Sequence, residues 1–190
     1  MSGVAFVAAV IVGLMLAEQR VSRAHERALR AAGAIEPPGD VYPLMAWLYP
    51  AAFVCMILEG AWRTAMPPVP GGPSWMAAGV LLMVASKLLK YWAIGSLGDR
   101  WSFRVLVLPG RPLVTTGPYR YVSHPNYIAV LGELVSTAMM MRAAVSGPLA
   151  VAAFAAVLWA RIRVEERALA EAAPRSQSAR VNVGRTRDDR

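Results

Sequence analysis

The connector between two apolar runs, residues 113–127, is dense in side chains that bind ligands. It holds three tyrosines, an arginine and one of the two histidines of the chain, together with the Gly117-Pro118 and His124-Pro125 steps. Proline removes a backbone donor and interrupts a helix, so this segment is not an ordinary membrane-spanning helix. Tyrosine rings on a stiff, proline-containing loop are typical of a binding site. We therefore expect a ligand site in this connector.

A second group of charged side chains follows the last apolar run, where Arg161 and Glu165 are four residues apart. If the helix of that run continues, the two side chains share one face. An arginine can hold an anionic substrate group, and a carboxylate can receive a ligand ammonium. Each residue taken alone also fits turn punctuation, a headgroup contact or a solvated helix end. Their combination favours a site for a zwitterionic or cationic cofactor beside a lipophilic acid.

Membrane helices are the elements that must position these groups. The chain is 56% hydrophobic and 17% charged, and its apolar residues form five blocks near residues 4–17, 41–58, 75–89, 127–141 and 143–160. These blocks approach the roughly 20 residues of a helix that crosses a bilayer, although the first and fourth are short. We predict an all-α, polytopic integral membrane protein with about five transmembrane helices. One domain covers residues 1–173, and residues 174–190 form a disordered basic tail.

The net charge of +8 reports topology, because the basic residues gather on one side of the predicted helices. All 20 lysines and arginines except Arg63 and Arg142 flank the same side. By the positive-inside rule, the amino terminus lies outside and the carboxyl terminus and the 113–127 connector face the cytoplasm. We therefore expect a multi-pass membrane protein that contacts membrane lipids and does not bind nucleic acid.

Several further ionisable groups lie within or beside the apolar blocks. Glu133 lies inside the fourth block, where a charge is costly unless it faces the bundle interior and finds a partner, so it is a candidate substrate contact. Lys87 and Lys90 are expected to reach lipid headgroups, and Glu59 the outer interface. The single cysteine, Cys55, excludes a disulfide framework and a zinc-type cluster, and no metal is expected. No glycine-rich phosphate loop follows a strand, which argues against a soluble dinucleotide fold.

The stretch from Pro112 to Tyr127, followed by Arg161 and the Glu165-Glu166-Arg167-Ala168-Leu169 run, closely resembles the isoprenylcysteine carboxyl methyltransferase family. The amino-terminal half, including residues 26–36 and the Tyr42-Pro43 pair, is similar to a bacterial branch often associated with type III polyketide synthases. The resemblance implies a methyltransferase of the bacterial inner membrane that binds S-adenosylmethionine in a pocket facing the cytoplasm. It also implies a functional link to such a synthase.

The resemblance implies roles for individual residues. The cofactor contacts would come from Arg111, Pro112, Leu113, Val114, Tyr119, His124, Pro125, Asn126, Tyr127 and Glu165. Arg161 would contact the substrate, and Glu165 would receive the amino group of the cofactor. Many family members have histidine where this chain has Arg111 and arginine where it has Ser123. The second departure leaves one positive charge fewer near the site.

The implied mechanism is direct displacement, in which a substrate oxygen attacks the methyl carbon of the sulfonium while the protein aligns the two and excludes water. A carboxylate or acidic enol needs no base; for a neutral phenol His124 is the candidate, with fixing of the turn as its structural alternative. The favoured substrate is a long-chain alkylpyrone or alkylresorcinol, followed by a prenylcysteine-like carboxylate and then a phospholipid amine. The competing functions are an NADPH-dependent reductase of the sterol-reductase type and a non-catalytic membrane scaffold.

Overall fold

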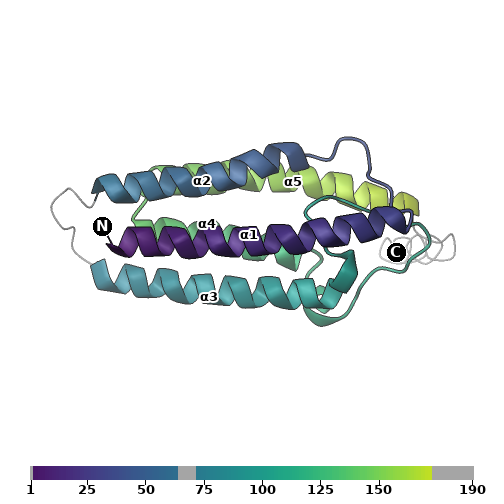
Figure 1. Cartoon of the computed structure of the whole chain (residues 1–190), viewed down its shortest axis with the longest axis horizontal. Helices are drawn as coiled ribbons and strands as arrows, with labels where there is room; N and C mark the ends of the chain where they lie inside the picture. Colours follow the sequence, from purple (N-terminus) through teal and green to yellow (C-terminus); the bar gives the residue numbers. More distant parts are fainter. Residues whose placement is uncertain (1, 64–71, 173–190) are drawn as a thin grey trace, which may run out of the picture.

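The computed structural model describes residues 2–63 and 72–172, which form a bundle of long helices lying side by side (Figure 1). The five α-helices are α1 (Ser2–Ala31), α2 (Tyr42–Arg63), α3 (Gly72–Leu97), α4 (Pro125–Met141) and α5 (Ser146–Ala172), and the two 3-10 helices are η1 (Gly98–Arg100) and η2 (Gly117–Arg120). Within these residues the only strand-like pairing is an isolated bridge between Ile35 and Val107. The prediction of an all-α fold is confirmed. The predicted disordered tail lies outside the described residues.

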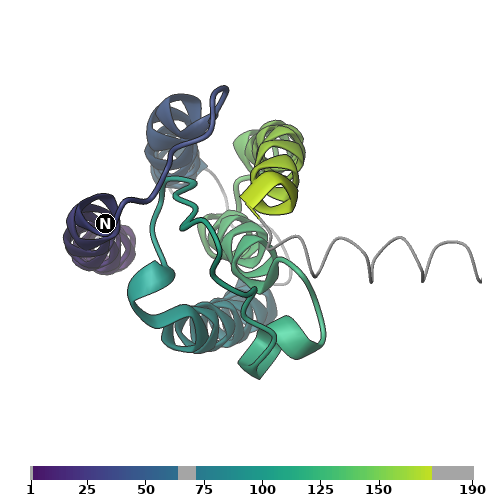
Figure 2. The ribbon, with the colours of Figure 1, turned by 90° about the vertical axis from the view of Figure 1, so that its right-hand side faces the viewer.

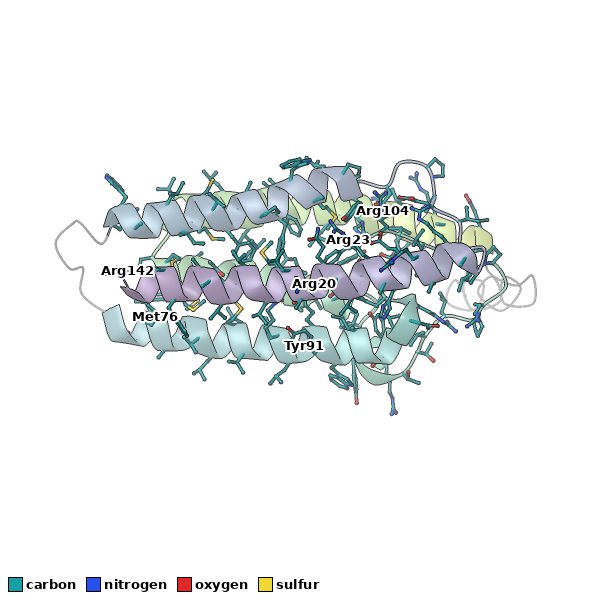
Figure 3. The ribbon with its side chains drawn as sticks, viewed as in Figure 1. Arg20, Arg23, Met76, Tyr91, Arg104 and Arg142 are labelled. Atoms are coloured by element: carbon teal, nitrogen blue, oxygen red, sulfur yellow. The ribbon has the colours of Figure 1, made fainter. Side chains whose placement is uncertain are left out.

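One end of the bundle, which we call the basic end, holds the last residues of α1, α3 and α5 and the first residues of α2 and α4. Figure 3 shows Arg23 and Arg104 toward this end, whereas Arg142 and Met76 lie toward the opposite end. The connector between α3 and α4 crosses the basic end, as the view onto that end shows (Figure 2). The connector therefore lies against the ends of several helices at once.

Three helices are long and apolar enough to cross a membrane: residues Tyr42–Arg63, Ser74–Arg100 and Ser146–Ala172. Helix α4 has 17 residues, so it rises about 26 Å, slightly less than a hydrocarbon core of about 30 Å. Helix α1 has 30 residues, but its apolar half is followed by charges from Glu18 onward. The structure thus supports a polytopic protein, and the count of five spans stays a prediction.

Helix α1 runs without a break from its apolar half into its charged half. Glycine and proline are absent between residues 14 and 32, so nothing interrupts the backbone hydrogen bonds. The helix ends at Gly33, whose φ of 85° lies in the left-handed region. The amide of Ala34 then donates to the carbonyl of Leu29 at 2.9 Å, which completes a glycine-terminated helix cap.

Small residues allow the helices to approach closely. A Cβ atom added at Gly60 would lie 2.8 Å from the carbonyl oxygen of Met141, and one at Gly132 would lie 2.2 Å from Ser86 Oγ. Such contacts are typical of helices packed within a membrane. The core between them is formed by large apolar side chains from α2, α4 and α5, including Phe53, Met56, Leu134, Phe154 and Leu158. In the end-on view, α4 lies in the middle, and its most extensive packing is against α3.

Glu59 closes the bundle at the end opposite to the basic end. Its carboxylate accepts hydrogen bonds from the amides of Val145 and Ser146, at 3.2 and 2.7 Å, and from Ser146 Oγ at 2.6 Å. These amides lie just before and at the first residue of α5, where backbone donors lack partners within the helix and a negative charge is favoured. Glu59 thus lies at the end of the bundle that the sequence analysis assigned to the outer side, and there it also caps a neighbouring helix.

Candidate functional site

The first turn of α4 and the second half of α5 meet at Tyr127. The Tyr127 hydroxyl donates to Glu165 Oε2 at 2.5 Å and accepts from Arg161 Nε at 2.8 Å. Arg161 and Glu165 are one turn apart on α5 and therefore lie on one face, which is turned toward α4. The structure thus brings together three of the residues that the sequence singled out.

His124 immediately precedes α4 and lies flat against Tyr127, with ring centroids 5.3 Å apart and an angle of 7° between the rings. Its Nδ1 is 3.9 Å from Glu165 Oε2, and its Nε2 is 3.4 Å from Glu166 Oε1. The side chain of His124 is 19% exposed and that of Glu165 is 29% exposed. A ligand arriving from the basic end can therefore reach both groups, which makes them the accessible part of the cluster.

Arg161 is the buried part of the same cluster. Its Nη1 donates to Asp40 Oδ1 at 3.0 Å and its Nη2 donates to the carbonyl of Phe103 at 2.5 Å, in addition to the bond from Nε to Tyr127. Its side chain is 5% exposed. Every nitrogen of the guanidinium thus has a partner within the protein. The predicted substrate contact of Arg161 is not open in this structure, where the residue links α5, α4 and two connectors.

Asp40 is a member of the cluster that the sequence analysis missed. Its side chain is 4% exposed. Besides Arg161, its carboxylate accepts the amides of Tyr42 and Val105, each at 3.0 Å. In the sequence it follows Pro37-Pro38-Gly39, in the connector between the first two apolar blocks. A useful signal was available, since a buried arginine near the membrane requires an anionic partner and few acidic residues flank the apolar blocks.

The 110–114 stretch lies beside the carboxyl-terminal end of α5. The Gly110 amide donates to the carbonyl of Ala172 at 3.2 Å, and Arg100 Nη1 donates to the carbonyl of Pro112 at 2.8 Å. The residues Arg111, Pro112 and Leu113 are exposed, and Val114 is half-buried. The structure therefore places these predicted cofactor contacts on the surface of the basic end.

Tyr119 and Asn126 lie closer to the cluster. Burial and the nearby Glu165 carboxylate raise the pKa of the Tyr119 hydroxyl, so this phenol stays protonated at neutral pH. Asn126 follows the buried Pro125, and its Oδ1 is buried with no hydrogen-bond partner among the described residues. A buried acceptor without a donor is costly, and a ligand that supplies an N–H or O–H would remove that cost.

A second polar cluster lies deeper in the bundle and contains Glu133. Lys90 Nζ is 2.8 Å from Glu18 Oε2 and 2.9 Å from Glu133 Oε1, while Lys87 Nζ is 2.7 Å from Glu18 Oε1 and 3.2 Å from Glu133 Oε1. The Tyr49 hydroxyl donates to Glu133 Oε2 at 2.5 Å. The prediction that Lys87 and Lys90 reach lipid headgroups is wrong. Two positive and two negative charges balance each other inside the bundle, which lowers the cost of burying them.

The comparisons with known proteins show which family this chain is similar to. Residues 79–171 match the isoprenylcysteine carboxyl methyltransferase (ICMT) family, and this range includes the connector before α4, α4 itself and α5 up to its last residue but one. The chain is 32% identical over 163 residues to the uncharacterised protein YpbQ of Bacillus subtilis, an alignment that covers 86% of this chain and 94% of that protein.

An uncharacterised protein of Haemophilus influenzae is 23% identical over 169 residues, which cover 88% of this chain and 95% of the relative. Both relatives are therefore similar to this chain over nearly their whole length, beyond the range of the family match. No solved structure matches the chain. Residues 113–127 of the connector and residues 161–169 of α5 lie inside the range that matches the family. From these matches, the chain belongs to the isoprenylcysteine carboxyl methyltransferase family, a family of membrane methyltransferases.

Proposed function

We propose that this protein is an integral membrane methyltransferase that transfers a methyl group from S-adenosylmethionine to an oxygen of a lipophilic acid or acidic hydroxyl. One observation carries the proposal. Within the range that matches the family, an accessible polar cluster is formed by Tyr127, Glu165 and His124. The buried Arg161 fixes this cluster through its hydrogen bond to the Tyr127 hydroxyl. A carboxylate, flat rings and a rigid support are the groups that a zwitterionic cofactor with an aromatic base requires.

The residues present fit this cofactor. The Glu165 carboxylate would receive the ammonium group, and the Asn126 amide oxygen, which lacks a donor in the structure, would accept an N–H or O–H. The rings of Tyr119 and His124 would flank the ligand, while residues 111–114 would contribute main-chain groups at its outer side. When bound, S-adenosylmethionine supplies a methyl group on a positively charged sulfur.

The chain contributes alignment and exclusion of water to the reaction. Arg161 holds the Tyr127 hydroxyl, and Tyr127 holds Glu165, so the position of the ligand-binding carboxylate is set by buried groups. An ionised acid or enol is already nucleophilic and requires no base. For a neutral phenol, an imidazole nitrogen of His124 would take the hydroxyl proton. A direct substrate contact by Arg161 would require the guanidinium to release Asp40 or the Phe103 carbonyl.

The membrane arrangement belongs to the same proposal. Helix α4 lies in the middle of the bundle, packed against α3, α5 and α2, so it would share the bilayer with the three long apolar helices. Helix α1 would add the fifth span, with the basic end toward the cytoplasm and the amino terminus outside. We favour a long-chain alkylpyrone or alkylresorcinol as the substrate in the inner membrane, supplied by a type III polyketide synthase. A prenylcysteine-like carboxylate and a phospholipid amine are the next candidates.

The test uses the full chain purified into lipid nanodiscs. Binding of S-adenosylmethionine and of NADPH is measured by calorimetry, and transfer of a radiolabelled methyl group is measured with each of the three substrate classes. We expect binding of S-adenosylmethionine, loss of that binding in Glu165→Gln, and retention in Glu171→Gln, which alters an exposed carboxylate of the same helix. Binding of NADPH alone would favour a reductase, and binding of neither cofactor by the folded protein would favour a scaffold.

A further inference from the structure

Four exposed arginines form one stripe along the second half of α1. We call Arg20, Arg23, Arg27 and Arg30 the arginine stripe. Spacings of three, four and three residues make each arginine a neighbour of the next on the helix surface. The buried residues of the same helix, which include Glu18, Ser22 and Leu29, lie on the side that faces the bundle. Because one turn of the helix takes about 3.6 residues, the stripe lies on the opposite side and points away from the protein.

The positive charge of the stripe is not balanced within the described part of the protein. The side chains of Arg20 and Arg23 form no hydrogen bond or ion pair among residues 2–63 and 72–172. Arg30 differs, because its Nη2 is 2.5 Å from Glu36 Oε2. The acidic residue next to the stripe in the sequence, Glu18, forms its ion pairs with lysines of α3 on the side of the bundle. Arg20 and Arg23 can therefore bind an anion from outside the protein.

Exposed tryptophans indicate where the two surfaces of a bilayer meet the bundle. On α3, Trp75 and Trp92 are exposed and 17 residues apart, which is about 26 Å along the helix. On α2, Trp47 and Trp62 are exposed and 15 residues apart, which is about 23 Å. Tryptophan favours the interface between membrane and water, and both spacings are close to the thickness of a hydrocarbon core. Trp92 therefore marks the level of the interface at the basic end.

The two unpaired arginines lie near that level. Glu18 Oε2 is 2.8 Å from Lys90 Nζ, so these residues of α1 and α3 lie at similar levels, and both helices run toward the basic end. Trp92 lies two residues beyond Lys90, about 3 Å along α3. Arg20 and Arg23 lie two and five residues beyond Glu18, about 3 and 8 Å along α1. Figure 3 shows Arg23 farther toward the basic end than Arg20. Both guanidinium groups are therefore at the height of the phospholipid head groups.

Exposed apolar side chains continue the stripe toward the opposite end of the bundle. Val12 and Leu16 lie eight and four residues before Arg20, on the same side of α1, and are 51% and 49% exposed. An acyl chain can lie on these side chains while phosphate oxygens accept hydrogen bonds from Arg20 and Arg23. The ammonium group of a zwitterionic lipid would be repelled by the neighbouring Arg27, whereas an uncharged alcohol in the head group would not.

We infer that the arginine stripe binds an anionic phospholipid, with its phosphate at Arg20 and Arg23 and one acyl chain along Val12 and Leu16. This inference goes beyond the proposed function, because it uses only the membrane arrangement and no step of methyl transfer depends on it. The lipid lies on the side of α1 that points away from the bundle. It therefore does not compete with the cofactor for the cluster around Tyr127.

Native mass spectrometry of the full chain, released from detergent micelles, measures the binding of single lipids. The anionic dioleoylphosphatidylglycerol is compared with dioleoylphosphatidylcholine, which has the same chains and a zwitterionic head group. We expect the anionic lipid to bind at least about fivefold more tightly, the effect of one arginine near an anionic group. Equal affinities would indicate ordinary lipid contacts and overturn the inference. An excess of glycerol phosphate should not displace the anionic lipid; displacement would mean that the stripe binds a soluble phosphate compound, and would also overturn it.

Two arginines of the same stripe provide a matched pair of variants. Arg23→Gln removes an unpaired guanidinium at the height of the head groups. Arg30→Gln removes the same charge from the same face, but about 10 Å farther along the helix and from a residue that is already paired with Glu36. We expect the anionic lipid to bind about fivefold more weakly to Arg23→Gln and to Arg20→Gln, and as tightly to Arg30→Gln as to the unchanged protein. An equal loss in Arg30→Gln would mean that the charge of the whole helix attracts lipid, and would overturn the location.

The failure of this inference differs from the failure of the proposed function. Arg23→Gln should bind S-adenosylmethionine as the unchanged protein does, because the stripe and the Tyr127 cluster share no residue. If S-adenosylmethionine does not bind but the anionic lipid is preferred and is lost in Arg23→Gln, the lipid site stands and the methyltransferase proposal falls. If S-adenosylmethionine binds and the two lipids bind equally, the proposed function stands and the lipid site falls.

Discussion

Removing the Asp40 carboxylate tests whether the candidate site depends on its buried support. The carboxylate accepts hydrogen bonds from Arg161 Nη1 and from the amides of Tyr42 and Val105, all at 3.0 Å. Asp40→Ala leaves the two amides without this acceptor and the guanidinium without its counter-ion, in a place where the side chains of both charged partners are 5% exposed or less. The perturbation therefore acts on a buried pair and not on a surface salt bridge.

The magnitude follows from the contacts that remain. Removing one partner of a buried ion pair costs about 3–5 kcal/mol. Arg161 keeps its bonds to Tyr127 and to the Phe103 carbonyl, so we expect the lower limit, a loss of about 3 kcal/mol in the free energy of unfolding. Binding of S-adenosylmethionine should weaken as well, because Arg161 then has two anchors in place of three and holds the Tyr127 hydroxyl, and through it Glu165, less rigidly.

A double-mutant cycle with Arg161→Met distinguishes this network from general damage. Unfolding is followed by titration with sodium dodecyl sulfate in mixed micelles. Because the double variant contains neither charge, its loss of stability should be smaller than the sum of the two single losses by at least about 1 kcal/mol. Asp99→Ala, which alters an exposed aspartate of η1, is the control and should have little effect. Additive losses, or an equal loss in the control, would refute the reasoning.

Three further changes address other parts of the molecule. Tyr127→Phe removes the hydroxyl that lies between Arg161 and Glu165. Calorimetry should show cofactor binding about tenfold weaker in this variant, which is the effect of losing one hydrogen bond to a charged group. Tyr121→Phe, which alters a ring that is 74% exposed, is the control and should bind the cofactor as the unchanged protein does. Glu59→Gln weakens the cap of α5 at the end of the bundle opposite to the basic end, so it should lower the free energy of unfolding by about 1 kcal/mol. Because the cofactor site lies at the basic end, cofactor affinity should not change, and an altered affinity would contradict this. Burial raises the pKa of Glu36, but its hydrogen bonds and charge interactions with Arg30 and Arg104 outweigh it and hold the pKa below its ordinary value. The stability that Glu36 contributes should therefore be fully present above the pKa of this group in the unfolded chain and should disappear as the pH falls through the lower pKa of the folded protein. Melting temperatures measured at decreasing pH should show this loss in the unchanged protein, and the part of it due to Glu36 should be absent in Glu36→Gln.

The helices were predictable because each buries a long apolar run, but their lengths were not. Helix α1 continues past its apolar block to Ala31, because charged residues without glycine or proline extend a helix as well as apolar residues do. Helix α3 continues past its block to Leu97, through a stretch that includes Lys90 and Gly95. Hydropathy reports where a helix meets lipid. It does not report where the backbone hydrogen bonds end, which here is set by residues such as Gly33.

Contacts within one helix were predictable, and contacts between helices were not. The spacing of Arg161 and Glu165 places both on one face of α5 in any structure that keeps the helix, and the structure has them on either side of the Tyr127 hydroxyl. Asp40 lies 121 residues from Arg161, so no local spacing connects the pair. Only the packing of α2 beside α5 brings these two residues together.

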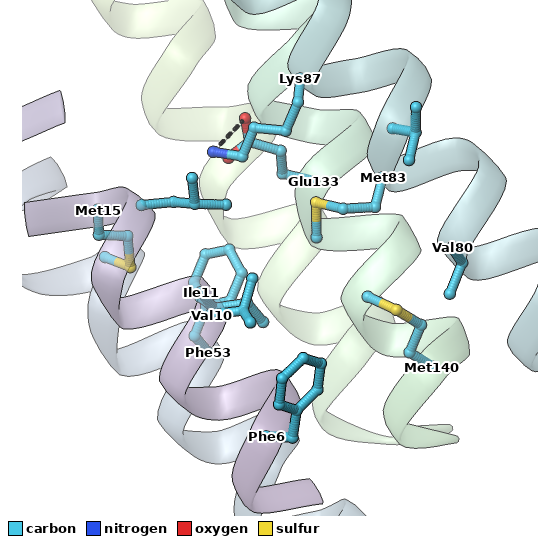
Figure 4. A pocket seen from close by; sticks show the side chains of 12 residues that line it. Phe6, Val10, Ile11, Met15, Phe53, Val80, Met83, Lys87, Glu133 and Met140 are labelled. Carbon is cyan, nitrogen blue, oxygen red and sulfur yellow. Dashed lines mark ion pairs between the residues drawn. The ribbon is translucent and has the colours of Figure 1, made fainter. Parts of the chain in front are cut away.

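Lys87 and Lys90 show why charge placement alone misleads in such a bundle. A lysine near the end of a membrane helix can extend to the headgroups, so each residue considered singly favours the surface. At a spacing of three, however, both ammonium groups lie on one face of α3, where Glu18 from α1 and Glu133 from α4 provide a carboxylate on each side. Four charges from three helices satisfy one another only when α1 lies beside α3 and α4. The same contact holds α1 in place at its middle, next to the apolar half of that helix, which lines a cavity together with residues of α3 and α4 (Figure 4).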